Sequence, residues 1–251
     1  MKKENSFNVR RMAIIGVLGA ISIILGMTPL GFIPVGPTRA TIMHIPVIIG
    51  AIMEGPLVGG IVGLIFGLFS MFQAYTNPTP VSFVFFNPIV SIVPRVLIGI
   101  VTHYVYSGLK KLGKKSTMLG LYFLWGSIIA YLSYGIYKNI VNADGIWIIM
   151  MNLMLIIIVL IFVYFTATKI NNNSIDLIIS TIVGTLTNTV GVLTMIYLFH
   201  GEKFVAAMGL DINTARKVIT GIGLTNGIPE VIVAIIIVTS VISALRVREM
   251  E

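Results

Sequence analysis

Long apolar runs separated by short polar segments dominate the hydrophobic pattern of the chain. A helix that crosses the hydrocarbon core of a bilayer needs about 20 predominantly apolar residues. Several runs reach or approach this length, so the pattern predicts an all-α membrane protein with about eight transmembrane segments. The predicted segments are Met12–Met27, Ile45–Met53, Leu57–Ala74, Phe85–Tyr106, Thr117–Tyr137, Ile146–Ala167, Ile175–Phe199 and Ile228–Leu245.

Two places interrupt the simple spanning pattern. The run Ile45–Met53 would form only about 14 Å of helix, against a hydrocarbon core of about 30 Å, and the Pro- and Gly-rich stretch Thr28–Pro37 before it is not expected to be helical. The second interruption is Thr76–Ser82, followed by Asn87-Pro88. Interrupted hydrophobic segments point to the binding site of a transporter. Both interruptions fall on the outer side of the expected topology, which predicts an outward-facing site.

The composition supports a single integral membrane domain over residues 1–251. Of the 251 residues, 57% are hydrophobic and only 10% are charged. The absence of cysteine excludes a disulfide framework and thiolate chemistry. No phosphate-cradling loop, nucleophile–base pair or metal-ligand cluster is readable in the sequence, so we expect no enzyme activity, no metal and no cofactor in this chain.

The net charge of +8 follows the expected topology better than it indicates nucleic-acid binding, because the basic residues lie at the ends of the apolar segments. With the N-terminus inside, eleven Lys and Arg residues fall on the cytoplasmic side and five on the outer side. This asymmetry predicts a multi-pass protein of the cell membrane with both termini cytoplasmic. The first apolar run lacks a small-residue cleavage pattern, and we interpret it as a retained helix.

Arg95 lies inside a hydrophobic stretch, where a permanent cation is costly. One interpretation is a buried ion pair with Glu54 or Glu230 that holds the bundle together; the other is a contact to an anionic ligand. Arg39 lies in an expected outer loop, where it is either a solvated charge or a second arginine that could bind an anion in a bidentate manner.

Several other polar residues lie beside the interruptions or in the middle of apolar segments. His44 is either a hydrogen-bonded structural residue or a ligand contact. Asn188, within Gly184–Thr189, needs a partner from another helix or a ligand. Asn226 could cap a helix that has Pro229 in its first turn and Glu230 near its positive end. The candidate substrate-binding residues are Arg95, Arg39, Asn87, Asn188, Asn226, Glu230 and His44.

Small residues form two smooth helix faces. Gly55, Gly59, Gly63 and Gly67 are each four residues apart, and this spacing predicts close packing inside the bundle. A second face, on the first helix, either packs internally or contacts a partner helix. It consists of Ala13, Gly16 and Ala20.

The order of these motifs resembles the substrate-binding S component of energy-coupling factor (ECF) vitamin transporters, with the pantothenate-type branch as the nearest likeness. The similarity covers residues 8–112 and 175–247. The strings that carry it are Thr41-Ile42-Met43-His44-Ile45-Pro46, Glu54-Gly55-Pro56, Gly63-Leu64-Ile65-Phe66-Gly67, Pro94-Arg95, Gly184-Thr185-Leu186-Thr187-Asn188-Thr189 and Asn226-Gly227-Ile228-Pro229-Glu230.

The resemblance implies a six-helix core, here with two inserted helices at 117–169, and a membrane subunit without ATPase activity. It implies association with a transmembrane coupling subunit and two ATPase subunits, and it assigns the face of Ala13, Gly16 and Ala20 to docking. The expected ligand is a vitamin-like small molecule, with pantothenate as the best choice and riboflavin or another vitamin as alternatives. An ion-coupled secondary transporter of a small organic anion remains a second class of function.

Overall fold

The computed structural model of the chain describes residues 9–35, 38–141 and 175–248, together with short helical pieces between 149 and 164. Within these residues, six helical stretches are long and apolar enough to cross a membrane. The predicted all-α membrane class is therefore confirmed, but the predicted number of eight segments is not supported. The helix Ile45–Glu54 has only 10 residues, and about half of the expected segment 146–167 lies outside the described residues.

The chain forms two compact units. Unit 1 comprises Met1–Ser107 and Leu177–Glu251, and unit 2 comprises Gly108–Asp176. Helix α5 is continuous from Val93 to Val141 except at Gly113, where φ is 73°. Glycine adopts this left-handed conformation without the steric cost that a Cβ would bring. In unit 2 the described part of α5 carries large exposed apolar side chains, among them Leu119, Phe123 and Tyr131.

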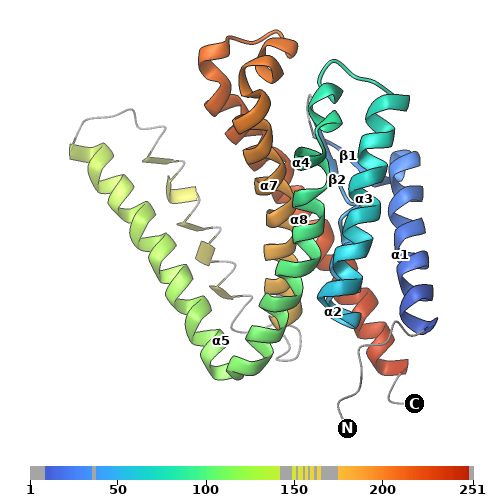
Figure 1. Cartoon of the computed structure of the whole chain (residues 1–251). Coiled ribbons are helices and arrows are strands. Elements are labelled where there is room, and N and C mark those ends of the chain that lie inside the picture. Colours follow the sequence, from blue (N-terminus) through green and yellow to red (C-terminus); the bar gives the residue numbers. More distant parts are fainter. Residues whose placement is uncertain are drawn as a thin grey trace. The chain divides into compact units, whose positions relative to one another are not determined.

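Unit 1 consists of helices with one small β-hairpin between the first two (Figure 1). Helix α1 begins and helix α8 ends at the same end of the unit, which we call the proximal end; the opposite end is the distal end. The elements are α1 (Val9–Met27), η1 (Pro29–Gly31), β1 (Phe32–Val35), β2 (Thr38–Thr41), α2 (Ile45–Glu54), α3 (Pro56–Thr76), η2 (Ser82–Phe86), α4 (Pro88–Ser91), the first part of α5, α7 (Ile175–Ala207), η3 (Ile212–Thr214) and α8 (Ala215–Arg248).

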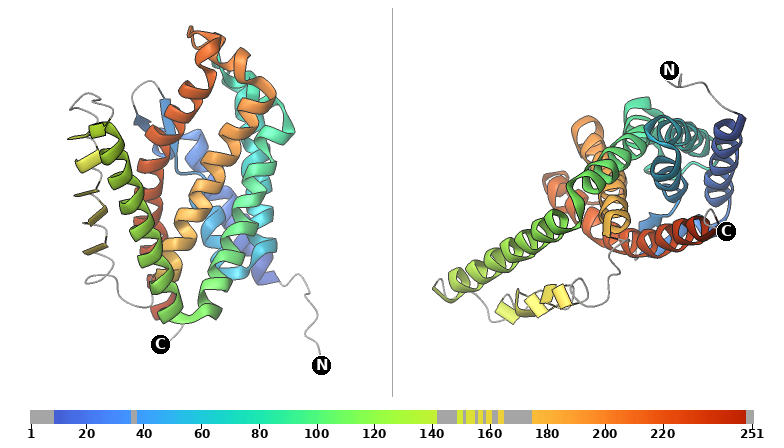
Figure 2. Two further views of the ribbon diagram at one scale, coloured as in Figure 1. Left: turned by 90° about the vertical axis from the view of Figure 1, so that its left-hand side faces the viewer. Right: turned by 90° about the horizontal axis from the view of Figure 1, so that it is seen from below.

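The hairpin and the short helix α2 follow one another along the chain and share one crossing of the unit. Strands β1 and β2 pair antiparallel, with Phe32 opposite Thr41. Helix α2 lies toward the proximal end and contacts α1, α3 and α8, as the view from below shows (Figure 2). In the described part of the Pro- and Gly-rich stretch Thr28–Pro37, no α-helix forms, as predicted, but the stretch contains the short 3-10 helix η1 and strand β1, which the sequence pattern does not predict.

The glycine stripe of α3 packs against the segment that carries Arg95. A Cβ at Gly63 would overlap the backbone of Arg95, and one at Gly67 would lie 2.8 Å from the carbonyl oxygen of Ser91. A Cβ at Gly59 would lie 2.9 Å from the Cα of Gly99. The predicted internal packing of this stripe is confirmed, and it brings the start of α5 into direct backbone contact with α3.

Two apolar clusters fill unit 1, one toward each end. The proximal cluster joins α1, α2 and α3 to later parts of α5 and α8, with Ile48, Ile98 and Val238 fully buried. The distal cluster joins η2 and α4 to α7 and the first part of α8, with Val90 and Val205 at its centre. Along α5, α7 and α8, buried polar residues lie between the members of these two clusters.

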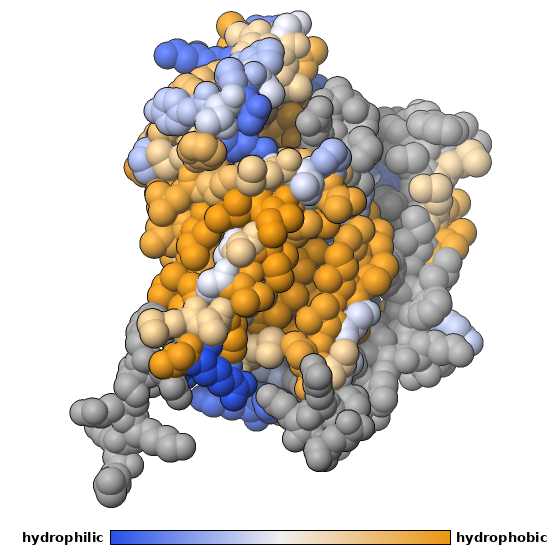
Figure 3. Space-filling model, turned by 90° about the vertical axis from the view of Figure 1, so that its right-hand side faces the viewer, coloured by the Kyte–Doolittle hydropathy of each residue, from blue (hydrophilic) through white to orange (hydrophobic). Residues whose placement is uncertain are grey.

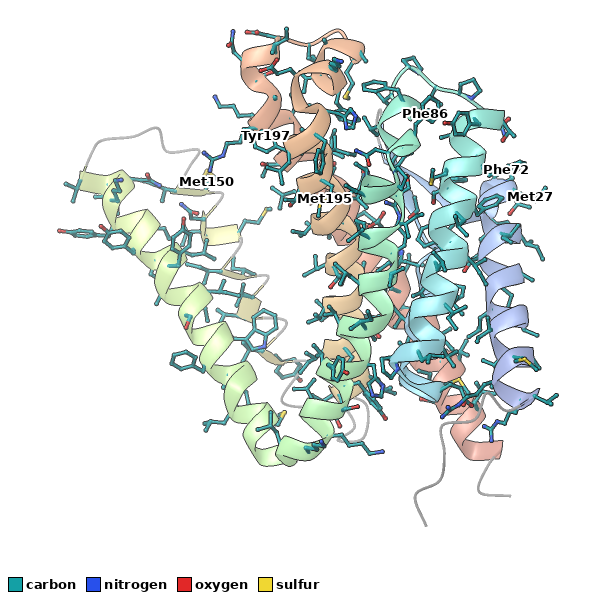
Figure 4. The ribbon with its side chains drawn as sticks, viewed as in Figure 1. Met27, Phe72, Phe86, Met150, Met195 and Tyr197 are labelled. Atoms are coloured by element: carbon teal, nitrogen blue, oxygen red, sulfur yellow. The ribbon has the colours of Figure 1, made fainter. Side chains whose placement is uncertain are left out.

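The outer surface of unit 1 is apolar in a broad band. On the face that includes α1, hydrophobic side chains form a continuous area between hydrophilic patches at the two ends (Figure 3). Met27, Phe72 and Phe86 are exposed and lie together toward the distal end (Figure 4). Exposed aromatic side chains near one end are typical of the membrane–water interface.

Candidate functional site

The buried polar residues between the two apolar clusters come from four different elements. We call Arg95, Asn188, Thr189 and Glu230, together with the backbone amide of Thr41, the polar cluster. Arg95 and Asn188 are each 6% exposed and Glu230 is 4% exposed. Because polar groups are buried at a cost unless they are paired, their concentration at one level marks this level as the candidate site.

Arg95 is held on three sides by α3 and by the segment before α5. Its Nη1 donates a hydrogen bond of 2.6 Å to the carbonyl oxygen of Val90. The rings of Phe66 and Phe85 each lie with their centroid 5.4 Å from the guanidinium carbon. Cation–π contacts at this distance are attractive and restrict the side chain. The guanidinium is thus fixed in one place, as an anion-binding arginine needs to be.

Glu230 on α8 supplies the negative charge with which Arg95 interacts. The amide of Thr41 donates a hydrogen bond of 2.7 Å to Oε1 of Glu230. The hydroxyl of Thr189 lies 2.6 Å from Oε2. These bonds connect strand β2, helix α7 and helix α8 at the carboxylate. Among the described residues Arg95 makes no direct ion pair with either glutamate considered for it; Glu230 is the one near enough to attract its charge.

Two buried atoms of the polar cluster make no hydrogen bond to any described residue. They are Nε of Arg95 and Oδ1 of Asn188. A buried donor or acceptor without a partner costs about 1–3 kcal/mol, so such atoms are uncommon and call for an explanation. One unused donor and one unused acceptor at the same level suit a ligand that carries both kinds of group.

His44 lies at the edge of this level and is fully buried at the start of α2. Its Nε2 is 3.1 Å from the hydroxyl of Thr185. Burial against a hydroxyl fits the structural interpretation of this histidine, and a contact with the ligand stays a prediction.

The remaining predicted residues occupy other surroundings. Asn87 caps α4, because its Oδ1 accepts a hydrogen bond of 3.0 Å from the amide of Ile89. Asn226 is half-buried inside α8, so its predicted role as a helix cap is wrong: α8 begins at Ala215 and continues through Pro229. The backbone of Arg39 pairs with Pro34 in the hairpin, and its side chain lies outside the described residues.

Glu54, the other glutamate considered for Arg95, lies at the proximal end of the unit. Its carboxylate oxygens are 3.3 Å from Nη2 of Arg10 and 3.6 Å from Nε of Arg11. These ion pairs connect the start of α1 to the end of α2. Arg95 therefore does not pair with Glu54.

The small-residue face of α1 points away from the bundle. Ala13, Gly16 and Ala20 are exposed, and a Cβ at Gly16 would meet no atom within 4 Å. The opposite face of the helix is buried through Ile15, Gly19, Ser22 and Gly26. The part of the chain that the structure describes leaves these three residues exposed.

The sequence did not indicate three contributors to the cluster. The Thr41 amide is a backbone group, and Phe66 lies in an ordinary apolar helix. Thr189 lies in the stretch Gly184–Thr189, but its bond to Glu230 joins residues 41 positions apart. The spacing of Thr185 and Thr189 on one face of α7 is a signal that could have indicated Thr189.

A fixed guanidinium, an open amide oxygen and a carboxylate can recognise a small polar anion. A carboxylate ligand suits Arg95, because the guanidinium matches carboxylate geometry. Hydroxyl or amide groups of the same ligand would find acceptors at Asn188 and Glu230. Nothing in the described residues groups three or more metal-ligating side chains.

Comparison with known proteins agrees with this chemistry. Residues 10–143 and 123–242 match the family model described as the substrate-specific component of ECF transporters. The pantothenic acid transporter PanT of Lactococcus lactis is 30% identical over 98% of this chain and 96% of its own length. The pantothenate transporter PanT of Leuconostoc mesenteroides is 36% identical over 41% of this chain and 50% of its own length. This chain belongs to the family of substrate-specific S components of ECF transporters, which are transport subunits and not enzymes.

Proposed function

We propose that this S component binds pantothenate at the polar cluster and delivers it to an ECF module. The observation that carries the proposal is the fixed, buried Arg95 with an open Nε, in a chain similar over 98% of its length to a pantothenic acid transporter. Pantothenate offers a carboxylate, an amide and two hydroxyls. These groups match one cation and several hydrogen-bonding side chains.

The proposed roles follow from the contacts. Arg95 binds the carboxylate, Asn188 accepts a hydrogen bond from the amide or a hydroxyl, and Glu230 accepts one from a hydroxyl. The aromatic ring of Phe85, already packed on Arg95, offers an apolar wall. Arg39, Asn87, Asn226 and His44 are proposed to line the path or the edge of the site.

We further propose that both termini are cytoplasmic, so that the distal end faces outward. The eleven Lys and Arg residues expected on the cytoplasmic side, against five on the outer side, support this orientation. We also propose a six-helix core with one inserted helix pair. The core comprises residues 8–112 and 175–247, and the inserted pair comprises residues 117–169. The alignment to the Lactococcus protein covers 98% of the chain and therefore runs through this pair, which supports an element shared by both proteins.

The proposed partners are a transmembrane coupling subunit and two ATPase subunits, with the face of Ala13, Gly16 and Ala20 as the docking surface. The exposure of these residues supports the assignment. Gly16→Leu should reduce co-purification of the ECF module while leaving ligand binding unchanged. Gly120→Leu is the matched control, because Gly120 is also exposed and a Cβ there would meet no atom within 4 Å. Equal co-purification of both variants would contradict the docking assignment.

Equilibrium binding to the purified full-length chain tests the substrate. Radiolabelled pantothenate should bind with a stoichiometry near one, and unlabelled pantothenate should displace it while an excess of riboflavin should not. Displacement by riboflavin alone would move the assignment to another vitamin. Transport into vesicles without any ATPase subunit would instead support an ion-coupled secondary transporter.

A further inference from the structure

The polar cluster contains one cationic side chain, Arg95, and one carboxyl group, Glu230. They make no direct ion pair but are near enough to interact electrostatically, and their side chains are 6% and 4% exposed. A ligand carboxylate on Arg95 would bring a second negative charge beside Glu230. In a buried setting an uncompensated charge costs several kcal/mol, so the site needs a further positive charge or the loss of a negative one.

The elements around Glu230 limit where that charge can come from. Helix α5 contributes Arg95, helix α7 contributes the neutral Thr189, and strand β2 contributes the amide of Thr41. His44, the residue just before helix α2, contacts Thr185. Arg39, two residues before Thr41, has a side chain outside the described residues. Among the described side chains, Arg95 is the charged group that acts on Glu230.

The hydrogen bonds of Glu230 can be satisfied with or without a proton on the carboxyl. The hydroxyl of Thr189 lies 2.6 Å from Oε2 of Glu230 and 3.3 Å from the carbonyl oxygen of Thr185. When Glu230 is charged, Thr189 donates to it. When Glu230 carries a proton, Oε2–H donates to Thr189, and Thr189 turns its own hydrogen toward Thr185. The amide of Thr41 donates to Oε1 in both states.

We propose that binding of a carboxylate ligand to Arg95 is coupled to the uptake of one proton by Glu230. A proton from the solvent forms the O–H bond at Oε2, and the complex then contains Arg95 as the cation and the ligand carboxylate as the anion. The inference rests on the proposed function of the same site. It adds that the affinity for the anion depends on pH, which a permanently charged Glu230 would not cause.

Isothermal titration calorimetry of the full-length chain in two buffers of different ionisation enthalpy measures the proton directly. The protein should take up about one proton for each pantothenate that binds. Over the pH range in which this uptake occurs, the Kd for pantothenate should rise about tenfold per pH unit. The sign follows from linkage, because uptake of a proton on binding weakens binding as protons become scarce. Binding of the alcohol analogue of pantothenate, which has a CH₂OH group in place of the carboxylate, should cause almost no proton uptake by the protein.

Variants assign the proton to a residue. Glu230→Gln is neutral and can still accept from Thr41 and donate to Thr189, so it should bind pantothenate with no proton uptake and with a Kd independent of pH. Glu54→Gln, at the proximal end, should retain the wild-type uptake. Uptake that survives in Glu230→Gln would contradict the assignment and point to His44 or to the ligand itself.

The wild-type result decides the inference even if a variant fails to fold. Binding heat that is the same in both buffers would overturn the coupling and leave the proposed function intact. The absence of pantothenate binding in any buffer, with binding of another ligand, would overturn the proposed function itself.

Discussion

Arginine and glutamate side chains lie near one another in two regions of unit 1, as direct ion pairs in one and without a direct ion pair in the other, and the two regions differ in how exposed the arginines are. At the proximal end, Glu54 contacts Arg10 and Arg11, whose side chains are 65% and 36% exposed. In the polar cluster, Arg95 and Glu230 are 6% and 4% exposed and lie between two apolar clusters. Water and salt reach the first pair but reach the second very little.

This difference separates a structural contact from a binding site. An exposed ion pair contributes about 0–1 kcal/mol to stability, which is enough to hold the start of α1 near the end of α2. A buried charge must be matched by an opposite charge or by hydrogen bonds, at a cost of several kcal/mol when it is not. An anion that enters the polar cluster therefore changes the energy of Arg95 and Glu230 strongly. An anion near the ion pairs of Glu54 has a much smaller effect.

Among the substitutions that test this comparison, Arg95→Ala should have the largest effect on ligand affinity. The variant removes the cation that binds the ligand carboxylate, and the affinity for pantothenate should fall by about 100-fold, or about 3 kcal/mol. Arg11→Ala removes one of the two arginines that contact Glu54 and should change the affinity less than about twofold. Equilibrium binding of both purified variants measures the contrast.

The charged residues of the site were readable from the sequence, whereas their partners were not. Arg95 and Glu230 stood out because charges are rare in apolar segments. Their surroundings depend on tertiary packing: the bond from Thr189 to Glu230 spans 41 positions and that from Thr41 spans 189. No local pattern encodes contacts at such separations.

Asn188→Leu should give the second-largest effect. The substitution removes the buried Oδ1 that has no partner among the described residues, and the loss of one ligand hydrogen bond should weaken binding by about tenfold. Thr187→Val is the matched control on the same helix, because that hydroxyl bonds back to the carbonyl oxygen of Val183. Similar losses in both variants would mean that α7 acts through packing instead of through a ligand contact.

Phe85→Leu should have a smaller effect on the same site. The ring of Phe85 contributes one of two cation–π contacts to Arg95, each of which stabilises by about 0.5–2 kcal/mol. We expect affinity to fall by about threefold to tenfold. The neighbouring Phe86, which stacks on Tyr75 with ring centroids 4.2 Å apart, provides the control Phe86→Leu, for which binding should not change.

Glu54→Gln should have the smallest effect. Loss of the proximal ion pairs should lower the free energy of unfolding by less than about 1 kcal/mol, with an effect that decreases as salt concentration rises. Thermal unfolding of the purified chain at low and high salt measures this change. A decrease of several kcal/mol would contradict this expectation and would show that the ion pairs of Glu54 contribute far more to stability than exposed pairs do.

Two errors of the sequence-based prediction have physical causes in the membrane setting. Pro229 suggested a helix start near Asn226, yet α8 runs through it from Ala215 to Arg248. Transmembrane helices tolerate an interior proline because neighbouring groups satisfy the freed carbonyl. The segment Ile45–Met53 was counted as a span, although α2 has 10 residues and shares its crossing with the hairpin of Phe32–Val35 and Thr38–Thr41.

The central claim is that Arg95 binds the carboxylate of the ligand. The most direct test compares two ligands, one with and one without a carboxylate, on the wild type and on one variant. The affinities of wild type and Arg95→Ala are measured for pantothenate and for its alcohol analogue. If Arg95 binds the carboxylate, the variant should lose about 100-fold in affinity for pantothenate and less than about threefold for the alcohol. Equal losses for both ligands, or no loss for pantothenate, would contradict the assignment of the polar cluster as the carboxylate-binding site.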